Sequence, residues 1–504
     1  MLIRTDRKSA PAEQDGDELG LPIPAQIISN SEYVPIPQTP RQRRTEKLVR
    51  EMTEERARKL GWSRRRFLSS SAGMATALMA LNLVNGCGDD GEGGGFAVDD
   101  CATRDPAAAR ERLAQEYFIM DVQTHHVDLE GAPRLNPALG EVFRTFRFCA
   151  PAAVAPDQMC TRGALQELSL ANYLKEMFLD SETTIAMMSG IPAPSAGAQA
   201  LSNEAMAHTR DVADRLGASQ RALTQGMLTP NFPPTNDSGT LISDMEHLVR
   251  DLGARALKTY PGAGGSGLWG NAPAWWLDDE AVAYPMYAEA ERLGLNIVNV
   301  HKGFTLGIFD PEHIHPRDVP KAVRDWPQMN FVIYHSAGEF LDELARIKRE
   351  ELPDRTNVYA ELGSIFAQAV IQGPIQVGHL LGKLLNSFGP NHILWGTDSI
   401  WWGSPQWQIN ALKSFVMPQQ LIDQFGYPQV TPEIKAKIFG LNAARIYGVD
   451  ADAVRCTLPH DLIEQAKVAY EDDGLREPSL RTYGPKTRRE FLQLAFGHGH
   501  NPLA

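Results

Sequence analysis

The run Leu295-Asn296-Ile297-Val298-Asn299-Val300-His301 is a largely apolar stretch that ends in a histidine. A helical pattern over Glu280–Leu293 precedes it, and Gly294 stands between the two, where a left-handed helix cap favours glycine. In this stretch the apolar side chains do not alternate strictly with polar ones, and such a pattern is typical of a strand buried on both faces. This unit predicts a helix followed by a strand of a parallel sheet.

The same unit recurs along the chain. Helical patterns such as Asn203–Leu216, Leu241–Leu252 and His379–Phe388 separate further apolar runs, which implies a parallel sheet with crossover helices. The predicted strands are Phe118–His125, Thr184–Ser189, Ala222–Leu228, Arg255–Tyr260, Leu295–His301, Asn330–His335, Asn357–Leu362 and His392–Asp398. Eight such repeats predict an α/β fold, a closed (β/α)8 TIM barrel, with an open doubly wound sheet as the alternative.

Side chains able to do chemistry stand at the ends of these runs. The first run ends in His125, the fifth in His301, the sixth in His335 and the last in Asp398. In a (β/α)8 barrel the active site lies where the strands end, so these four side chains are expected to converge. Imidazole nitrogens with a carboxylate suit Zn²⁺ or a similar metal. We therefore expect one divalent metal ion, with Zn²⁺ favoured, held by His125, His301 and Asp398.

These residues also form an ordered pattern. It consists of Asp121, Gln123, His125, His301, His335, Thr397, Asp398 and the helix motif Gly440–Arg445. Over Phe118–Gly448 the chain thereby resembles the amidohydrolase superfamily, in its amidohydrolase 2 branch of TIM-barrel, metal-dependent hydrolases and decarboxylases. The resemblance implies that Asp398 takes a proton from the attacking water and passes it to the leaving group. It also implies that His335 hydrogen-bonds the substrate carbonyl oxygen.

The chain departs from the family pattern at Gln123. The family's His-x-His pair falls on Gln123 and His125, because side chains alternate along a strand and His126 has the opposite parity. A neutral amide oxygen is a poorer Zn²⁺ ligand than imidazole or carboxylate. Gln123 is therefore expected to bind the metal weakly, to hold a water, or to mark a barrel that has lost its metal.

Further residues at the predicted mouth are candidates for substrate binding. Lys258 and Glu361 end the fourth and seventh runs, and Lys258 is expected either to bind a substrate carboxylate or to pair with Glu361. Trp401 and Trp402 follow Asp398 directly. With Trp269, Trp275, Trp276 and Trp407 in two predicted mouth loops, they favour an apolar or aromatic small-molecule substrate.

Three functions remain open at this point. The first is an exported hydrolase that cleaves an amide, ester or lactone bond through a metal-activated water. The second is a metal-dependent decarboxylase, a lyase in which Asp398 protonates the ring carbon of an aromatic acid. The third is a metal-free barrel that acts as a binding protein. We favour hydrolysis, because Gln123 does not reproduce the glutamate that related decarboxylases show at this position.

The N-terminal region has a different composition. Residues 1–62 combine a proline-rich stretch with a charged run and are expected to be disordered, with at most a fraying helix over Thr45–Leu60. Ser63–Leu68 holds three arginines and Ser69–Val84 is uncharged, so residues 63–87 resemble a twin-arginine signal read by the export machinery. Cys87 resembles a lipoprotein cleavage site. The protein is therefore expected to be periplasmic, either free or tethered to a membrane through lipidated Cys87.

The remaining expectations concern the other segments and partners. Residues 88–115 are expected to be a linker, 116–450 the barrel, and 451–504 a C-terminal extension with a helix over Leu462–Asp472. A net charge of −13 argues against nucleic acid as a partner, because phosphate binding needs clustered Lys and Arg. Cys149 and Cys160 lie in the insertion Gly131–Leu165 and are expected either to form a disulfide or to stay free. Cys101 and Cys456 are likewise either paired or free.

Overall fold

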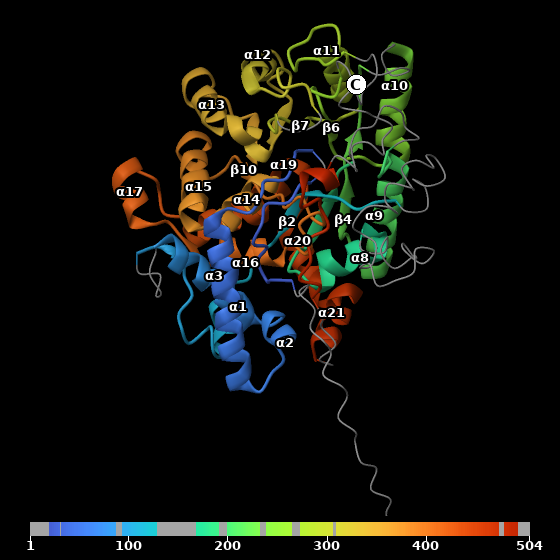
Figure 1. The fold of residues 1–504 in the computed structure, drawn as a ribbon. Coiled ribbons are helices and arrows are strands. Elements are labelled where there is room, and N and C mark those ends of the chain that lie inside the picture. The colour runs from blue at the N-terminus through green and yellow to red at the C-terminus, as the bar shows by residue number, and fades with distance from the viewer. Residues whose placement is uncertain are drawn as a thin grey trace, which may run out of the picture.

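The computed structural model describes residues 20–30, 32–86, 93–128, 168–190, 199–231, 238–264, 273–305, 309–472 and 478–491. These residues form a mixed α/β structure with parallel strands inside and helices around them (Figure 1). The insertion Gly131–Leu165, most of the glycine-rich stretch after the fourth run, Trp269, and the cysteines Cys87, Cys149 and Cys160 lie outside the described residues, and so does the disulfide expectation.

Each predicted run contains a parallel strand, which confirms the α/β class. The strands are β2 (Met120–Thr124), β3 (Ile185–Met188), β4 (Ala222–Thr224), β5 (Gly226–Met227), β6 (Leu257–Thr259), β7 (Ile297–His301), β8 (Asn330–Tyr334), β9 (Val358–Glu361) and β10 (Ile393–Leu394). β4 and β5 share one predicted run and are separated by Gln225.

The strands pair in the order β2-β3-β4 and β5-β6-β7-β8-β9-β10, in parallel throughout. Backbone bonds also join β2 to the chain after β10. Val122 N donates to Trp395 O at 3.0 Å, and Asp398 N donates to Gln123 O at 2.9 Å. The carboxyl ends of the first and last strands therefore lie side by side.

Helices connect successive parallel strands, and further helices follow β10, the last of these strands. They are α8 (Leu170–Leu174), α9 (Asn203–Gly217), α10 (Ser238–Glu246), α11 (Ala283–Arg292), α12 (Val319–Asp325), α13 (Leu341–Arg346), α14 (Gly363–Gln372), α15 (Pro374–Phe388), α16 (Gln406–Ser414), α17 (Gln419–Phe425), α18 (Pro432–Ala436) and α19 (Asn442–Tyr447). Gly294 follows α11 with a φ of 80°, the left-handed conformation expected at that helix end.

A buried apolar cluster fills the space between the strands. It comprises Phe118, Met120, Val122, Ile185, Met187, Leu223, Ala256, Ile297, Val332, Tyr334, Tyr359, Leu394, Ala443, Ala444 and Tyr447. Met120 and Val122 are two residues apart, as the alternation of side chains along a strand requires. The interior below the strand ends is thus packed, and polar side chains gather above it at the carboxyl ends.

The expected disorder of residues 1–62 is wrong for the part of that segment that the structure describes. Helix α1 (Pro40–Leu60) begins with a capping box between Thr39 and Gln42 and ends at Gly61 in a left-handed conformation. Its face with Val49, Met52 and Ala57 is buried. The segment before it is also buried at Ile23, Ile27, Ile28 and Tyr33. These four side chains are covered by the rest of the molecule, whereas Ile36 is 44% exposed.

The apolar run after the arginines is also part of this packed body. It forms α3 (Ser71–Asn85), which follows the short α2 (Arg64–Leu68) and contacts α1, α15 and α4 (Pro106–Arg112). Asn82 pairs with the backbone of Phe96 in both directions, at 2.7 and 2.9 Å. No helix in the described part of the chain is both long and apolar enough to span a membrane.

The predicted linker and C-terminal extension are likewise structured where they are described. Within residues 88–115, β1 (Gly95–Phe96) pairs antiparallel with β11 (Phe415–Val416), and α4 follows. Beyond α19 lie α20 (Ala451–Thr457) and α21 (Leu462–Asp472), the latter with the predicted bounds. Cys101 and Cys456 are exposed free thiols.

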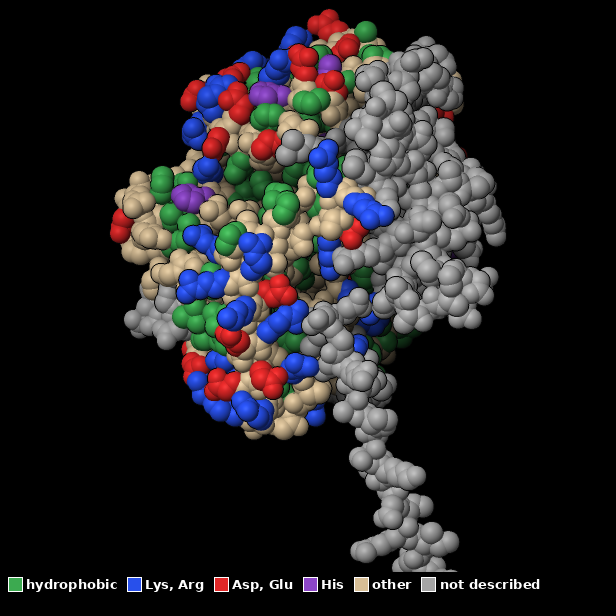
Figure 2. Space-filling model, in the orientation of Figure 1, with side chains coloured by type: hydrophobic (Ala, Val, Ile, Leu, Met, Phe, Trp, Pro, Cys, Tyr) green, Lys and Arg blue, Asp and Glu red, His purple; other side chains and the backbone are tan. Residues whose placement is uncertain are grey.

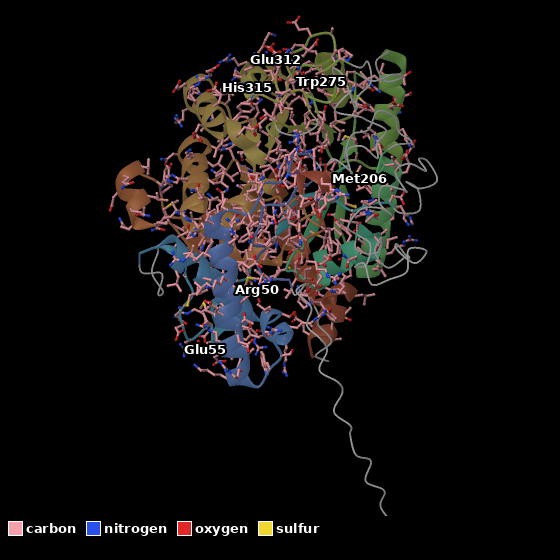
Figure 3. All side chains as sticks on the ribbon, viewed as in Figure 1. Arg50, Glu55, Met206, Trp275, Glu312 and His315 are labelled. Atoms are coloured by element: carbon pink, nitrogen blue, oxygen red, sulfur yellow. The ribbon has the colours of Figure 1, made fainter. Side chains whose placement is uncertain are left out.

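The surface carries both signs of charge. On the face shown in Figure 2, Lys and Arg side chains alternate with Asp and Glu over the N-terminal helices instead of gathering in one patch. Arg50 and Glu55, labelled in Figure 3, are two such residues on α1.

Candidate active site

The candidate site lies at the carboxyl ends of the strands. His301 is the last residue of β7, His335 follows β8, and His125 directly follows β2. His335 and Asp398 have φ values of 56° and 59°, a left-handed conformation that non-glycine residues rarely adopt. Such strained residues persist only where the surroundings hold them, and they cluster at functional sites.

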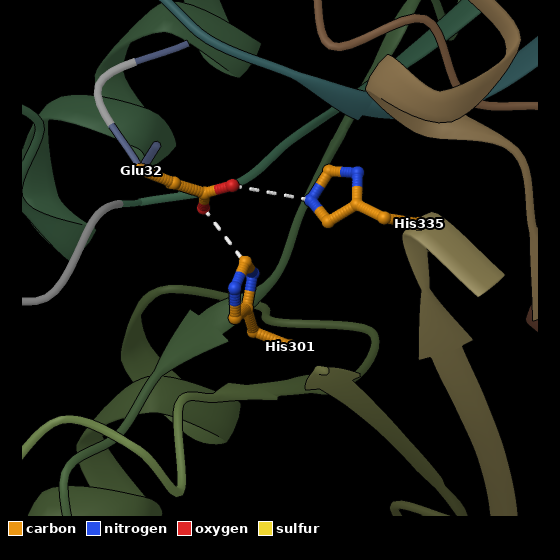
Figure 4. Close-up of side chains that lie close together, drawn as sticks. All are labelled: Glu32, His301 and His335. Carbon is orange, nitrogen blue, oxygen red and sulfur yellow. Dashed lines mark ion pairs between the residues drawn. The ribbon is translucent and has the colours of Figure 1, made fainter. Parts of the chain in front are cut away.

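Glu32, from the N-terminal segment, points into this site between two of the histidines (Figure 4). Its Oε1 lies 3.4 Å from His301 Nδ1, and its Oε2 lies 3.2 Å from His335 Nε2. All three side chains are buried, and one ligand atom from each lies within 4.8 Å of the others. This makes a compact carboxylate–imidazole cluster.

Asp398 forms the second part of the site, beside His125. His125 Nε2 lies 3.0 Å from Asp398 Oδ1, and His125 Nδ1 lies 2.6 Å from the carbonyl oxygen of Ser189. Asn30 Nδ2 donates to Asp398 Oδ2 at 2.6 Å, and the Ser364 hydroxyl also donates to that oxygen. Because His125 donates its Nδ1–H to this carbonyl, its Nε2 faces the Asp398 carboxylate. A proton or a metal ion between Nε2 and the carboxylate satisfies both groups.

Asn30 links the two parts. Its Nδ2 donates to Glu32 Oε2 at 2.6 Å as well as to Asp398, and its Oδ1 accepts from the backbone N–H of Glu32 at 3.1 Å. The carboxylates of Glu32 and Asp398 are therefore held on either side of one amide. The predicted site residues His125, His301, His335 and Asp398 meet in one connected network, which Glu32 and Asn30 complete.

Gln123 lies against this network and not at its centre. Its amide is 3.2 Å from His335 Nε2 and 3.3 Å from Asp398 Oδ1. With the amide turned the other way, its nitrogen donates to both oxygens of Glu361, at 3.3 and 3.1 Å. A Cβ atom on Gly363, whose φ is 43°, would come within 2.5 Å of His335 Nδ1, so only glycine fits beside this ring.

Burial and charge give the two histidines of the cluster different pKa values. Burial lowers the pKa of His301 to about 3, so this ring is neutral at pH 7. Burial also opposes the charged form of His335, but its hydrogen bond to Glu32 and the nearby carboxylates raise the pKa above its usual value. Burial disfavours ionised Glu32, yet His301 and His335 hold the pKa of this carboxyl far below its usual range. Glu32 and His335 are thus an ion pair beside a neutral imidazole.

The donor set fits a divalent metal ion. Neutral imidazole and carboxylate are the ligand types that Zn²⁺ and similar metals prefer. Among the described residues, neither ring nitrogen of His301 has a hydrogen-bond partner, although the side chain is fully buried. Buried polar atoms are almost always satisfied, so two orphaned nitrogens call for a partner of another kind. Glu32, His301 and His335 are the residues that could hold this ion.

Lys258 and Glu361 lie beside the cluster, and of the two expectations for Lys258 the described contacts do not include an ion pair with Glu361. Lys258 Nζ has no hydrogen-bond partner in the described part of the chain and sits 3.4 Å from the centre of the Tyr334 ring. Burial lowers its pKa to about 7. Glu361 Oε2 accepts from the backbone N–H of His335 at 2.9 Å, and burial raises its pKa to about 7. Glu361 thus supports His335, and Lys258 is left available to an anion.

The tryptophans occupy two kinds of position. Trp401 is 3% exposed and packs in the core, while Trp402 Nε1 donates to Ser364 Oγ at 2.9 Å, one step from Asp398. Trp402 and Trp407 also line a cavity of about 590 Å³, together with Leu21, Pro22, Arg66 and Ser404. Trp275, labelled in Figure 3, is buried away from this cavity. The cavity adjoins the Asp398 side of the network and not the Glu32 cluster.

Three members of the network escaped sequence reasoning. Glu32 and Asn30 precede β2 by almost ninety residues and carry no strand-end signal. Ser364 is the second residue of α14, three residues after Glu361, and its place just beyond a strand end was the one available signal. The contacts of Asn30 and Ser364 with Asp398 span 368 and 34 residues of sequence.

The comparisons with known proteins give a family match and distant structural neighbours. Residues 184–449 match the family model described as Amidohydrolase. No curated protein matches the chain.

Similar solved structures include an uncharacterised TIM-barrel protein from Bordetella bronchiseptica (18% identity, covering 66% of this chain and 98% of that one, TM-score 0.42). They also include 2,6-dihydroxybenzoate decarboxylase from Rhizobium (13%, 66% and 99%, TM-score 0.41). A third is 4-oxalomesaconate hydratase from Rhodopseudomonas palustris (16%, 71% and 100%, TM-score 0.41).

Proposed function

The chain belongs to the amidohydrolase family of enzymes, and we propose that it is a metal-dependent hydrolase of an amide, ester or lactone bond in a small, apolar or aromatic molecule. The observation that carries the proposal is the buried cluster of Glu32, His301 and His335 beside Asp398. A bound divalent metal, with Zn²⁺ the favoured ion, supplies Lewis acidity that polarises a carbonyl group and acidifies water.

The chain's own residues supply the proton transfers. Burial works against ionised Asp398, but the hydrogen bond and charge of His125 lower its pKa below the usual value, so it is a carboxylate at pH 7. Such a group accepts a proton from the attacking water and returns it to the leaving group. Without a metal, Glu32 holds His335 in its protonated form, and a metal ion bound among Glu32, His301 and His335 would displace that proton.

We further propose that the eight βα units close into a (β/α)8 barrel. Support comes from the backbone bonds between β2 and the chain after β10, and from the parallel bridge between Thr124 and Ser399. The near-continuity of β4 and β5 on the other side joins the two runs of paired strands.

Decarboxylation of an aromatic acid is the second candidate, and Lys258 is the observation that favours it. A buried ammonium without a hydrogen-bond partner among the described residues suits the carboxylate of a substrate. Lys258 belongs to the same group of side chains, since Glu32, Glu361 and Asp398 all act on it electrostatically. In this reaction Asp398 would first take a proton from water and then deliver it to the ring carbon, from which CO₂ leaves.

The test is an assay of the full chain against lactones, aryl esters, amides and hydroxybenzoates, with released CO₂ measured separately. We expect turnover that stops on chelation and returns with Zn²⁺ or Mn²⁺. Asp398→Asn should lower kcat by about 100- to 10,000-fold. Asp452→Asn, at a side chain that is 89% exposed, is the matched control. Turnover that survives both chelation and Asp398→Asn would contradict the proposal, and CO₂ release without hydrolysis would select the decarboxylase.

A further inference from the structure

The segment before α1 runs across the strand ends and enters the site. Ser29 and Asn30 are no more than 1% exposed, and Glu32 is 2% exposed. Ser29 N donates to Pro485 O at 2.8 Å, and Tyr33 OH donates to Ile28 O at 2.6 Å. The segment is therefore fixed on both sides of Glu32, by the C-terminal region and by its own backbone.

Position 123 on β2 is where the site lacks a strong metal ligand. Gln123 offers only a neutral amide there, and its amide lies 3.2 Å from His335 Nε2. Glu32 Oε2 approaches the same nitrogen at the same distance, 3.2 Å. The Glu32 carboxylate thus lies beside His335 Nε2, where β2 offers only the amide of Gln123.

We propose that Glu32 is a metal ligand of this enzyme and acts with His301 and His335, supplying from the N-terminal segment the anionic ligand that Gln123 cannot provide. This inference rests on the proposed function, because it presumes that the site holds a divalent metal. Asn30 is then a positioning residue. It fixes Glu32 through two hydrogen bonds and holds Asp398 with the same amide nitrogen.

The surroundings of Glu32 favour a ligand over a simple ion-pair partner. An ion pair with His335 satisfies one of its oxygens. Among the described residues His301 has no hydrogen-bond partner for either ring nitrogen, and its Nδ1 lies 3.4 Å from the other oxygen of Glu32. Tyr33 packs on Phe304 with ring centroids 4.5 Å apart, and Phe304 packs on His335 at 4.8 Å. These rings close the cluster on the side of the segment, which keeps water from competing for the ligand atoms.

The experiment measures Zn²⁺ affinity on the full chain, by competition with a chromophoric chelator, together with metal content after dialysis. Glu32→Gln keeps the shape of the side chain and one accepting oxygen but removes its charge. We expect Zn²⁺ affinity to fall by at least about 100-fold, which exceeds the loss typical for residues that only support a ligand. Glu54→Gln, on the exposed face of α1, is the matched control and should bind Zn²⁺ like the wild type.

The outcomes separate this inference from the proposed function. Unchanged or tighter Zn²⁺ binding by folded Glu32→Gln overturns the inference and makes the segment a plug that covers the site, while the proposed function stands. A wild-type chain that binds no Zn²⁺ or Mn²⁺ overturns both. Glu32→Asp is the second variant, for use if Glu32→Gln does not fold. It keeps a carboxylate one methylene shorter, so its affinity should be reduced but measurable, and an unchanged affinity counts against the inference.

Discussion

Two neighbouring histidines at the end of β2 have different partners. His125 faces Asp398, whereas His126 Nε2 lies 2.9 Å from Thr209 Oγ1 on α9. The alternation of side chains along a strand accounts for this difference. His126 is 4% exposed and takes no part in the network around Asp398, so its titration can be followed without disturbing the site.

His126 makes the protein sensitive to acid. Burial lowers its pKa to about 4 from an ordinary value of 6.5. As the pH falls from 6.5 towards 4, the unfolded chain takes up a proton at this position and the folded chain does not, so the wild type loses stability in that window. His126→Gln keeps a hydrogen bond to Thr209 and cannot titrate.

Urea unfolding at pH 7, 5.5 and 4 checks this expectation. The stability difference should move in favour of His126→Gln by up to about 3 kcal/mol between pH 7 and pH 4. A difference that is the same at all three pH values would mean that His126 is not held neutral by burial.

The strand-end residues could be found from the sequence, and Glu32 could not. His301, His335 and Asp398 each close an apolar run, and a parallel sheet brings the ends of its strands to one edge whatever the loops do. Glu32 has no such local mark. Its position depends on contacts such as that between Ser29 and Pro485, which form only when both ends of the chain have packed.

At the scale of elements, the strands were predictable because each is a short apolar run bounded by helical patterns. A helix was expected over Thr45–Leu60, but its packing against the rest of the molecule was not predictable, because α1 has a mostly charged sequence with only a narrow buried face at Val49, Met52 and Ala57. A mostly charged composition is typical of a disordered segment, and the buried face of α1 is explained only by its packing against α3. The prediction of a linker over residues 88–115 missed β1 for the same reason, because β1 forms only by pairing with β11.

The C-terminal helix α21 is tied to the strands by a buried ion pair. Arg221, just before β4, lies 3.1 Å from Asp461 and 3.0 Å from Glu464, and the side chains of Arg221 and Asp461 are fully buried. Removing one partner of such a pair leaves an uncompensated charge in the interior.

Arg221→Met should therefore destabilise the protein by about 3–5 kcal/mol in denaturant unfolding. Adding Asp461→Asn removes the orphaned charge and should recover part of the loss, since asparagine can still accept from the backbone at the start of α21. Lys47→Met, at an exposed pair with Glu51 on α1, should cost no more than about 1 kcal/mol. An equal, small effect at Arg221 and Lys47 would show that α21 is not anchored in this way.

At the scale of the whole molecule, the N-terminal segment, the strand ends and the C-terminal region form one unit around the site. This bears on the twin-arginine signal and on lipidation at Cys87, which stay predictions from Ser63–Cys87. Cleavage after Gly86 would separate the segment that carries Glu32 from the strands that carry His301 and His335. If Glu32 is a ligand, an exported enzyme keeps its metal only where this segment stays bound to the strand ends.

The central claim is that a divalent metal sits among Glu32, His301 and His335. Anomalous X-ray diffraction from crystals of the full chain grown with Zn²⁺ or Mn²⁺, recorded on both sides of the absorption edge of the metal, tests it most directly. The account predicts one strong anomalous peak in contact with the Glu32 carboxylate and the rings of His301 and His335. A peak held by His125 and Asp398 without Glu32, or no peak at the strand ends, would contradict it.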